Sequence, residues 1–235
     1  MAPRTKTRPP LARDRILRVA LELADESGID AVSMRELGRR LGFEAMSLYN
    51  HVANKDDVID GILELVVAEM EPPSPDGDWD TAIRASAISV YRALRRHPWA
   101  SGLLMSAARV NTTRMEYMDS LLGRLRSAGF SAATTYHAYH ILDAHIFGFS
   151  LWQAGHTFKA GDLPKLAADF VERFPLHDYP HLQEHFDQHM GGELDTVSAF
   201  EFSLDLMLDG LRQIRAAETK PPRRRSAART KSTKA

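Results

Sequence analysis

A run of small, polar and aromatic residues between Glu44 and Val52 has side chains that suit contact with DNA bases. The base edges in the major groove offer hydrogen-bond donors, acceptors and thymine methyl groups, which polar and apolar side chains of this kind can match. The residues that the helical pattern leaves pointing outward are Ala45, Met46, Ser47, Tyr49, Asn50 and His51. The chemistry that they can perform together is recognition of base edges rather than catalysis.

A first short helix is expected directly before this run. Ser33 followed by Glu36 forms a capping box, in which the Ser33 oxygen accepts from the Glu36 N–H and the Glu36 side chain reaches back. Gly42 stands where a helix often ends in the left-handed conformation. One apolar stripe of this helix faces inward, formed by Met34, Leu37 and Leu41.

A second helix is expected to begin at about Glu44, with Leu48 and Val52 on its buried side. Phe43 fills the corner between the two helices. Two helices joined by a tight turn, the second with a polar and small outward face, are typical of a unit that inserts into the DNA major groove.

The stretch from Ala31 to Leu63, AVSMRELGRRLGFEAMSLYNHVANKDDVIDGIL, resembles the DNA-binding domain of the tetracycline-repressor (TetR) family. The resemblance is carried by the helix SMRELGRRLG, the recognition segment LYNH and the following helix NKDDVIDGIL, and it covers about Arg13 to Glu71. It implies eight DNA contacts, at Arg35, Ala45, Met46, Ser47, Tyr49, Asn50, His51 and Lys55.

The resemblance also implies how these contacts divide between bases and backbone. Arg35 reaches a phosphate or a base from the first helix, whereas the first residues of the second helix meet base edges. Ala45 and Met46 suit thymine methyl groups, and Asn50 can pair with adenine through two hydrogen bonds. The remaining residues, Tyr49, His51 and Lys55, contact the DNA backbone. A solvated helix face is the alternative, and which bases are read does not follow from the sequence.

Charge is distributed unevenly along the 235 residues, although the net charge is only −1. Residues 1–55 carry ten Lys and Arg against seven Asp and Glu, residues 56–219 carry thirteen against twenty-four, and residues 220–235 carry seven against none. An acidic body with two basic ends suggests an anionic partner for the ends. Because the first ten residues and the tail cannot bury apolar area, they are expected to be disordered.

Composition excludes several classes of protein. There is no cysteine, which rules out disulfides, thiolate zinc sites and cysteine nucleophiles. The sequence has no nucleophile elbow, no Gly-rich phosphate loop and no HExxH, so we expect no enzyme and no cofactor. The N-terminus lacks the apolar core of a secretory signal, and no stretch approaches the ~18 apolar residues of a membrane helix. We therefore expect a cytoplasmic protein without a membrane partner.

The periodic segments predict an all-α protein. The expected organisation is a basic arm at 1–10, a helix-turn-helix domain with its connecting helix at 11–71, a linker at 72–79, an effector-binding and dimerisation domain at 80–217, and a basic tail at 218–235. The connecting helix, from about Lys55 to Glu71, has a broad apolar surface. It must contact both the DNA-binding unit and the second domain, so it would link the ligand state to the geometry of DNA binding.

Two helices, at about 133–152 and 196–216, are apolar on more than one face. Two such helices from each of two subunits would form a four-helix interface, and AFEFSLDLMLDGL resembles the closing dimer helix of TetR-type regulators. A two-fold dimer also places two recognition helices about one DNA turn apart. The alternative is a large core. The predicted interface residues are Phe147, Leu151, Phe200, Leu204, Met207, Leu208 and Leu211.

The family resemblance places an effector pocket among the central helices. Its predicted lining is mostly apolar and comprises Ser86, Val90, Leu104, Met118, Leu121, His140 and Ala144. Such a lining favours a hydrophobic or aromatic small molecule, and plain core packing is the alternative for each residue. The founding repressor holds a magnesium–drug chelate through a histidine whose place here is about Leu104, so we expect no tetracycline–magnesium site.

His181, His185 and His189 recur every four residues and share one face of a predicted helix. This is the spacing of metal ligands, but no second ligand cluster accompanies it, and surface histidines are the alternative. We expect no metal site.

The sequence as a whole predicts a dimeric, all-helical transcriptional regulator, most simply a repressor. It would bind a palindromic operator in double-stranded DNA and respond to a small-molecule effector. Two alternatives remain open at this point: a nonspecific DNA-binding protein that uses its basic ends, and a helical small-molecule-binding protein.

Overall fold

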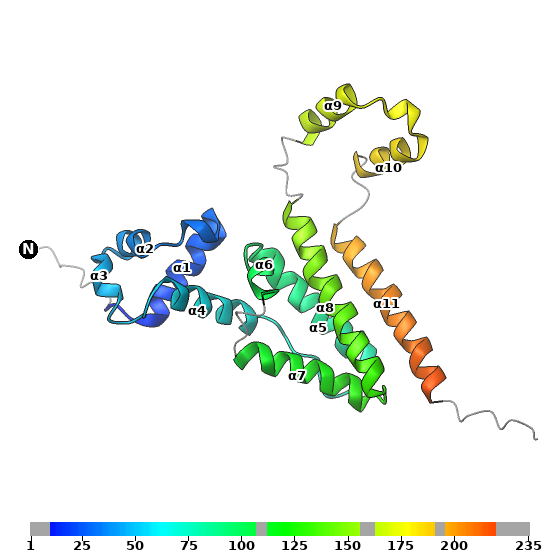
Figure 1. Cartoon of the computed structure of the whole chain (residues 1–235), viewed down its shortest axis with the longest axis horizontal. Coiled ribbons are helices and arrows are strands. Elements are labelled where there is room, and N and C mark those ends of the chain that lie inside the picture. The colour runs from blue at the N-terminus through cyan, green and yellow to red at the C-terminus, as the bar shows by residue number, and fades with distance from the viewer. Residues whose placement is uncertain (1–9, 107–111, 156–162, 191–195, 220–235) are drawn as a thin grey trace, which may run out of the picture.

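The computed structural model describes residues 10–106, 112–155, 163–190 and 196–219, and within them it contains helices and no strands (Figure 1). This confirms the all-α prediction. The predicted basic arm and tail lie outside the described residues, except for their innermost ends. Among the described helices, none has the length and apolar character needed to span a membrane.

The N-terminal head consists of α1 (Arg13–Ser27), the short η1 (Ile29–Ala31), α2 (Met34–Leu41) and α3 (Ala45–Leu48). Its core contains the apolar stripes that the sequence pattern predicts for α1 and α2, together with two residues on the inner side of α3 and the turn after it. The buried side chains include Ile16, Leu17, Ala20, Leu23, Val32, Leu37, Leu41, Leu48 and Val52. Three short helices thus enclose one small core.

The connecting helix α4 (Lys55–Ala68) contributes to two cores at once. Val58 and Ile62 lie in the core of the head, whereas Leu63 and Val66 lie in the core of the second domain. At Gly61, α4 approaches α1 so closely that a Cβ atom would lie 2.7 Å from Leu17 Cδ2. The prediction that α4 contacts both domains is confirmed. A displacement of the C-terminal half of α4 must therefore also move the residues of the head that pack on it.

The second domain, called the body below, contains α5 (Trp79–Arg96), α6 (Ala100–Leu104), α7 (Thr112–Ser127), α8 (Ala132–Gly155) and α11 (Thr196–Glu218). Helices α5, α8 and α11 lie side by side (Figure 1) and share a core in which Tyr91 and Phe200 stack with ring centroids 3.9 Å apart. Arg84 of α5 also pairs with Glu201 and Asp205 of α11. Aromatic packing and these ion pairs hold α11 against α5.

Helices α9 (Leu163–Arg173) and α10 (Pro180–Met190), with η3 (Leu176–Asp178) between them, form a separate arm beyond the ends of α8 and α11 (Figure 1). Phe170 of α9 stacks on Phe186 of α10 with ring centroids 5.7 Å apart, which joins the two helices. His181 and His185 are exposed on α10, and the side chain of His189 lies outside what the structure describes. No group of three potential metal ligands occurs among the described residues.

Candidate DNA interface and internal pocket

The turn between α2 and α3 is built by local backbone interactions. Ser33 Oγ accepts the Glu36 N–H at 3.3 Å, as the capping box predicts. Gly42 has φ 70° and ψ 36°, the left-handed conformation that glycine adopts without a steric penalty. The Phe43 N–H then donates to Gly38 O at 2.9 Å, which closes the end of α2. The Ser33 cap fixes the start of α2, whereas the Gly42 conformation and the hydrogen bond from Phe43 to Gly38 set the angle between α2 and α3.

Gly38 permits the close approach of α2 to the start of α3. A Cβ atom at this position would lie 2.8 Å from Phe43 O, 3.1 Å from Ala45 N and 3.2 Å from Ala45 Cα. All three neighbours are backbone atoms, which cannot rotate away. A side chain at Gly38 would therefore force the backbone of Phe43 and Ala45 to shift away from α2.

The eight predicted DNA-contact residues lie on α2, on α3, in the turn after α3 and at the start of α4. Six of them are exposed, and Met46 is 75% exposed although it is a large apolar residue. The helix itself is shorter than expected: α3 ends at Leu48, and the N–H groups of His51 and Val52 both donate to Leu48 O. Tyr49, Asn50 and His51 therefore lie in a tight turn that follows α3, rather than on a continuous helix, and Lys55 begins α4.

Glu36 holds two of the arginines of α2. Arg39 donates to its carboxylate at 2.6 and 2.8 Å, and Arg40 donates at 3.3 Å. The hydrogen bond from Arg39 is the main cause that lowers the pKa of Glu36 to about 2. Arg35, one turn earlier, is exposed on the same helix and points a positive charge outward. Glu36 thus holds Arg39 and Arg40 but not Arg35.

The N-terminus of α4 is fixed to α1 by a carboxylate. Asn54 caps α4 by accepting the Asp57 N–H at 2.8 Å. Asp57 in turn accepts the Ala53 N–H at 2.8 Å and pairs with Arg13 of α1 through two contacts of 2.8 and 2.9 Å. The hydrogen bond from Arg13 is the main cause that lowers the pKa of Asp57 below its usual range.

We expect Asp57→Asn to reduce the stability of the head and to remove part of its acid sensitivity. Because folding lowers the pKa of Asp57, its contribution is present above the unfolded value of about 3.9 and is lost as the pH falls through the folded value. At neutral pH the variant should lose about 1 kcal/mol, since solvent screens the half-exposed Arg13. Urea unfolding at pH 6 and at pH 3 measures this. Asp30→Asn, at an exposed position of η1, is the control, and equal pH dependence in the three proteins would contradict the assignment.

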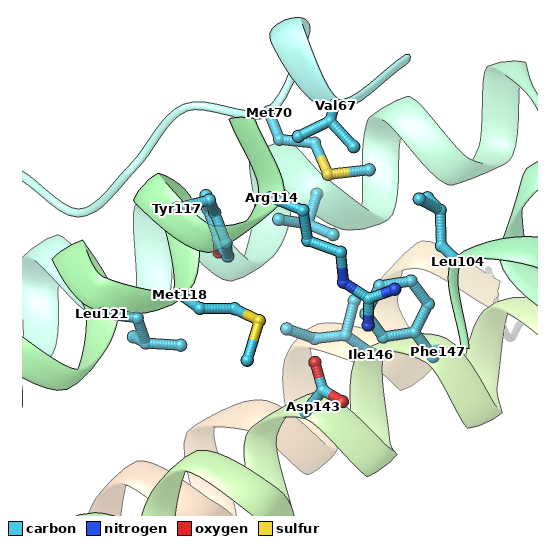
Figure 2. Close-up of a pocket in the computed structure, with 11 residues that line it drawn as sticks. Val67, Met70, Leu104, Arg114, Tyr117, Met118, Leu121, Asp143, Ile146 and Phe147 are labelled. Atoms are coloured by element: carbon cyan, nitrogen blue, oxygen red, sulfur yellow. The ribbon is translucent and has the colours of Figure 1, made fainter. Parts of the chain in front are cut away.

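An internal pocket lies where the end of α4 meets α5, α6, α7 and α8 (Figure 2). Its walls are mostly apolar and comprise Val67, Met70, Val90, Leu104, Met118, Leu121, Ile146 and Phe147, with three polar residues, Arg114, Tyr117 and Asp143. The cavity volume is only about 20 Å³, which is room for roughly one water molecule. A larger ligand therefore requires the walls to move apart.

Four of the seven predicted pocket residues line this cavity, namely Val90, Leu104, Met118 and Leu121. Ser86 lies behind the wall, where its hydroxyl contacts the Tyr117 hydroxyl at 2.9 Å and donates to Glu71 O at 2.7 Å. His140 and Ala144 are exposed, which corrects their predicted placement. The buried face of α8 passes through Leu142 and Ile146, so these two residues fall on its opposite side.

The polar residues of the pocket were not predicted from the sequence. In Figure 2 the Arg114 guanidinium and the Asp143 carboxylate both point into the space between the apolar walls. Arg114 also lies over the Phe147 ring, 5.6 Å from its centroid. Burial raises the pKa of Asp143, and burial raises the pKa of Tyr117 to about 12. The apolar pocket thus contains a cation and a carboxyl group, whereas the Tyr117 hydroxyl contacts Ser86 behind the wall.

The predicted dimer residues divide into two groups. Five of them pack in the core of a single chain, where each is at most 7% exposed: Phe147, Phe200, Leu204, Leu208 and Leu211. This corrects their assignment to a subunit interface. Leu151 is 39% exposed, and Met207 is partly buried. The apolar residues that α8 and α11 do expose are Tyr136, Ile141, Leu151, Trp152, Phe202, Leu206 and Ile214.

Comparison with known families gives two matches that together span most of the chain. Residues 16–62 match the family described as bacterial regulatory proteins, tetR family. Residues 71–215 match the tetracyclin repressor-like C-terminal domain. The two matches meet close to the end of α4, where the connecting helix passes from the head into the body.

The matches to individual relatives cover most of each relative and most of this chain. An HTH-type transcriptional regulator of Saccharopolyspora erythraea is 33% identical over 77% of this chain and 78% of the relative. The HTH-type transcriptional repressor DrrR1 of Streptomyces coeruleorubidus is 28% identical over 87% of this chain and 78% of its own length. The solved structure of ActR from Streptomyces coelicolor superposes with a TM-score of 0.70 at 26% identity, over 89% of this chain and 98% of ActR. The chain therefore belongs to the TetR family of bacterial regulatory proteins.

Proposed function

We propose that this protein is a transcriptional repressor that binds a palindromic DNA operator as a homodimer and releases it when a small hydrophobic effector enters the body. The observation that carries this proposal is the double role of α4, whose residues lie in the core of the head and also line the pocket. The protein acts in the cytoplasm, where its DNA is, and has no enzymatic activity.

The closed pocket supports a mechanism for release. Val67 and Met70, at the end of α4, form one wall of a cavity too small for an effector. An effector must therefore push α4 away from α7 and α8. Because α4 is packed on α1, its displacement changes the position of the head. A ligand that binds the opened pocket better shifts the population toward that state and lowers operator affinity by the same coupling energy.

The lining indicates the chemical class of the effector. Apolar walls favour a hydrophobic body, and Arg114 with Asp143 at one edge favours a ligand that carries both an acceptor and a donor there. Among solved relatives, ActR has been determined in complex with actinorhodin, at 26% identity and a TM-score of 0.70. A planar aromatic molecule with hydroxyl or carbonyl groups along one edge fits this lining. Leu104 lines the pocket, and its apolar side chain supports the expectation that magnesium is not part of the ligand.

The exposed apolar residues of α8 and α11 support the homodimer. Phe202 and Leu206 of α11 are 68% and 58% exposed, a condition that is costly for large apolar side chains gathered on one face. A Cβ atom added at Gly148 or Gly210, on the same two helices, would meet no atom within 4 Å, which leaves room for close helix packing. Joining two copies through this face would cover the patch and form a four-helix interface.

The effector part of the proposal is tested by removing both charges from the pocket. We expect Arg114→Gln/Asp143→Asn to bind operator DNA within about twofold of the natural protein but to need roughly tenfold more effector for release, because charged hydrogen bonds to the ligand are lost. Changing both residues avoids leaving one buried charge unpaired. The measurement is release of fluorescent operator DNA, selected beforehand by the protein itself, during titration with hydroxylated anthraquinones.

Arg92→Gln, which removes an exposed arginine of α5, serves as the control for loss of a surface charge. Release by the same concentrations in all three proteins would show that the effector does not use this pocket. Failure of every hydroxylated anthraquinone to release operator DNA from the natural protein would reject the proposed effector class.

A further inference from the structure

His97 lies where the head, α4 and the body meet, and it is only 5% exposed. It follows the last residue of α5. Its Nδ1 atom lies 2.7 Å from Oδ1 of Asp25, near the end of α1, and its Nε2 atom lies 3.2 Å from Oε1 of Glu69, directly after α4. The His97 ring, which belongs to the body, thus contacts Asp25 of the head and Glu69 at the end of the connecting helix.

Both ring nitrogens of His97 face carboxylate oxygens, and these two contacts favour the protonated ring. An ionised carboxylate only accepts hydrogen bonds, so both ring nitrogens must donate. A neutral imidazole has one N–H and the imidazolium has two. The charged groups that α1, α4 and α5 place around His97 are Asp25, Glu69 and Arg96. Arg96 donates to Glu69 Oε2 at 2.9 Å, and Trp99 Nε1 donates to Asp25 Oδ1 at 2.8 Å.

Two anionic and two cationic groups therefore balance at this junction when the ring is protonated. Burial acts to raise the pKa of Glu69, but hydrogen bonds from Arg96 and His97 lower it overall. Loss of the ring proton would leave a net negative charge and one carboxylate without its N–H donor. The His97 ring is buried, whereas Asp25 and Glu69 are partly exposed, so such a loss weakens the contact chiefly by leaving one ring nitrogen without its hydrogen bond.

The same junction borders the effector pocket. Glu69 lies in sequence between Val67 and Met70, which both line the cavity (Figure 2). Helix α6 begins three residues after His97, and its last residue, Leu104, lines the cavity from another side. A ligand that moves α4 or α6 apart must therefore change the distance between Glu69 and His97.

We propose that the His97 imidazolium is a positioning residue that joins Asp25 and Glu69 to the body and thereby holds the head in its closed-pocket, operator-binding arrangement. The inference rests on the proposed function for its DNA readout. Effector binding and loss of the ring proton act in the same direction, because each separates the head from the body. Because coupling between binding sites is reciprocal, protonation of His97 strengthens operator binding and weakens effector binding.

The first test measures affinity for the selected operator DNA between pH 5.5 and 8.5. The natural protein should bind the operator about tenfold more weakly at the upper end of this pH range than at the lower end. His97→Gln should bind at the weaker level throughout, with a flat profile. His51→Gln should keep the slope, which separates His97 from the histidine in the DNA-contact turn. A slope that disappears with His51 and persists without His97 would overturn the proposal.

Asp25→Asn provides a second variant at a more exposed position. The amide oxygen can still accept from Trp99 and His97, but the negative charge is gone. The pH at which affinity falls should therefore move down by comparison with the natural protein. An unchanged profile in Asp25→Asn would contradict the role of the carboxylate pair, even if His97→Gln folds poorly.

The second test needs no DNA. Because the chain has no cysteine, cysteines placed at exposed Glu22 of α1 and Arg92 of α5 can carry spin labels that report the distance between head and body. In full-length protein diluted with unlabelled chains, this distance should change between pH 6 and pH 8.5, and it should be independent of pH in His97→Gln. A constant distance in both proteins rejects the His97 proposal and leaves the proposed function intact. If the distance changes with pH but the protein selects no preferred DNA sequence, the role of His97 is supported and the proposed function is rejected.

Discussion

Gly38→Ala is expected to weaken sequence-specific DNA binding strongly while the body stays folded. The added methyl group would lie 2.8 Å from Phe43 O and 3.1 Å from Ala45 N, both backbone atoms, so α3 must move away from α2. Overpacking of this kind costs about 1–3 kcal/mol. The displacement also moves the DNA-contact turn, so operator affinity should fall by about 10- to 100-fold, the factor to which this cost corresponds.

Gly123→Ala is the matched control, since this exposed glycine of α7 has no neighbour within 4 Å of a Cβ position. Alanine there should stabilise the helix by roughly 0.5–1 kcal/mol and leave DNA binding unchanged. The measurement is operator affinity by fluorescence anisotropy, with circular dichroism to verify folding. Normal operator affinity in Gly38→Ala would show that the contact between α2 and α3 does not position the reading residues.

The second large effect is expected from two leucines that lie two residues apart on α11. Leu206 is 58% exposed and belongs to the apolar face proposed for the dimer, whereas Leu204 is 0% exposed and lies in the core of its own chain. Leu206→Glu should give monomers at micromolar concentration, because the charge would be buried without a partner at the interface. Operator affinity should fall by about a thousandfold, since one head then reads one half-site.

Leu204→Ala should behave differently, with a loss of about 2–5 kcal/mol in unfolding free energy from the cavity that it leaves. Sedimentation velocity and urea unfolding of the two variants separate the effects. A dimeric Leu206→Glu protein with normal stability would contradict the assignment of the exposed face of α8 and α11 to the subunit contact.

The head was predictable from the sequence because its signals are local. The Ser33 cap, the left-handed Gly42 and the spacing of Leu37, Leu41 and Leu48 all act within a few residues. Each of these local preferences points to the same fold, which is the condition under which sequence reasoning succeeds. The exception is the length of α3. The N–H groups of His51 and Val52 both donate to Leu48 O, and the helix ends at Leu48 before the last predicted contacts.

The pocket and the dimer face were less predictable because α8 and α11 are apolar on more than one side. Hydrophobic periodicity identifies a helix that is covered on several faces, but it does not say whether its own chain or a second copy covers each face. Phe147, predicted at the interface, lines the pocket instead. Arg114 and Asp143 come from α7 and α8 and meet only through tertiary packing, so no local pattern brings them together.

Selection of bound sequences from a random pool of double-stranded DNA, at physiological salt, tests the central claim most directly. The natural protein should enrich a palindromic site with half-sites about one helical turn apart. A Tyr49→Ala/Asn50→Ala variant, changed only in the exposed turn after α3, should lose this enrichment and keep the nonspecific, salt-sensitive binding that basic segments provide. Equal binding by both proteins with no enriched motif would contradict the regulator assignment and favour a nonspecific DNA-binding protein that uses its basic ends.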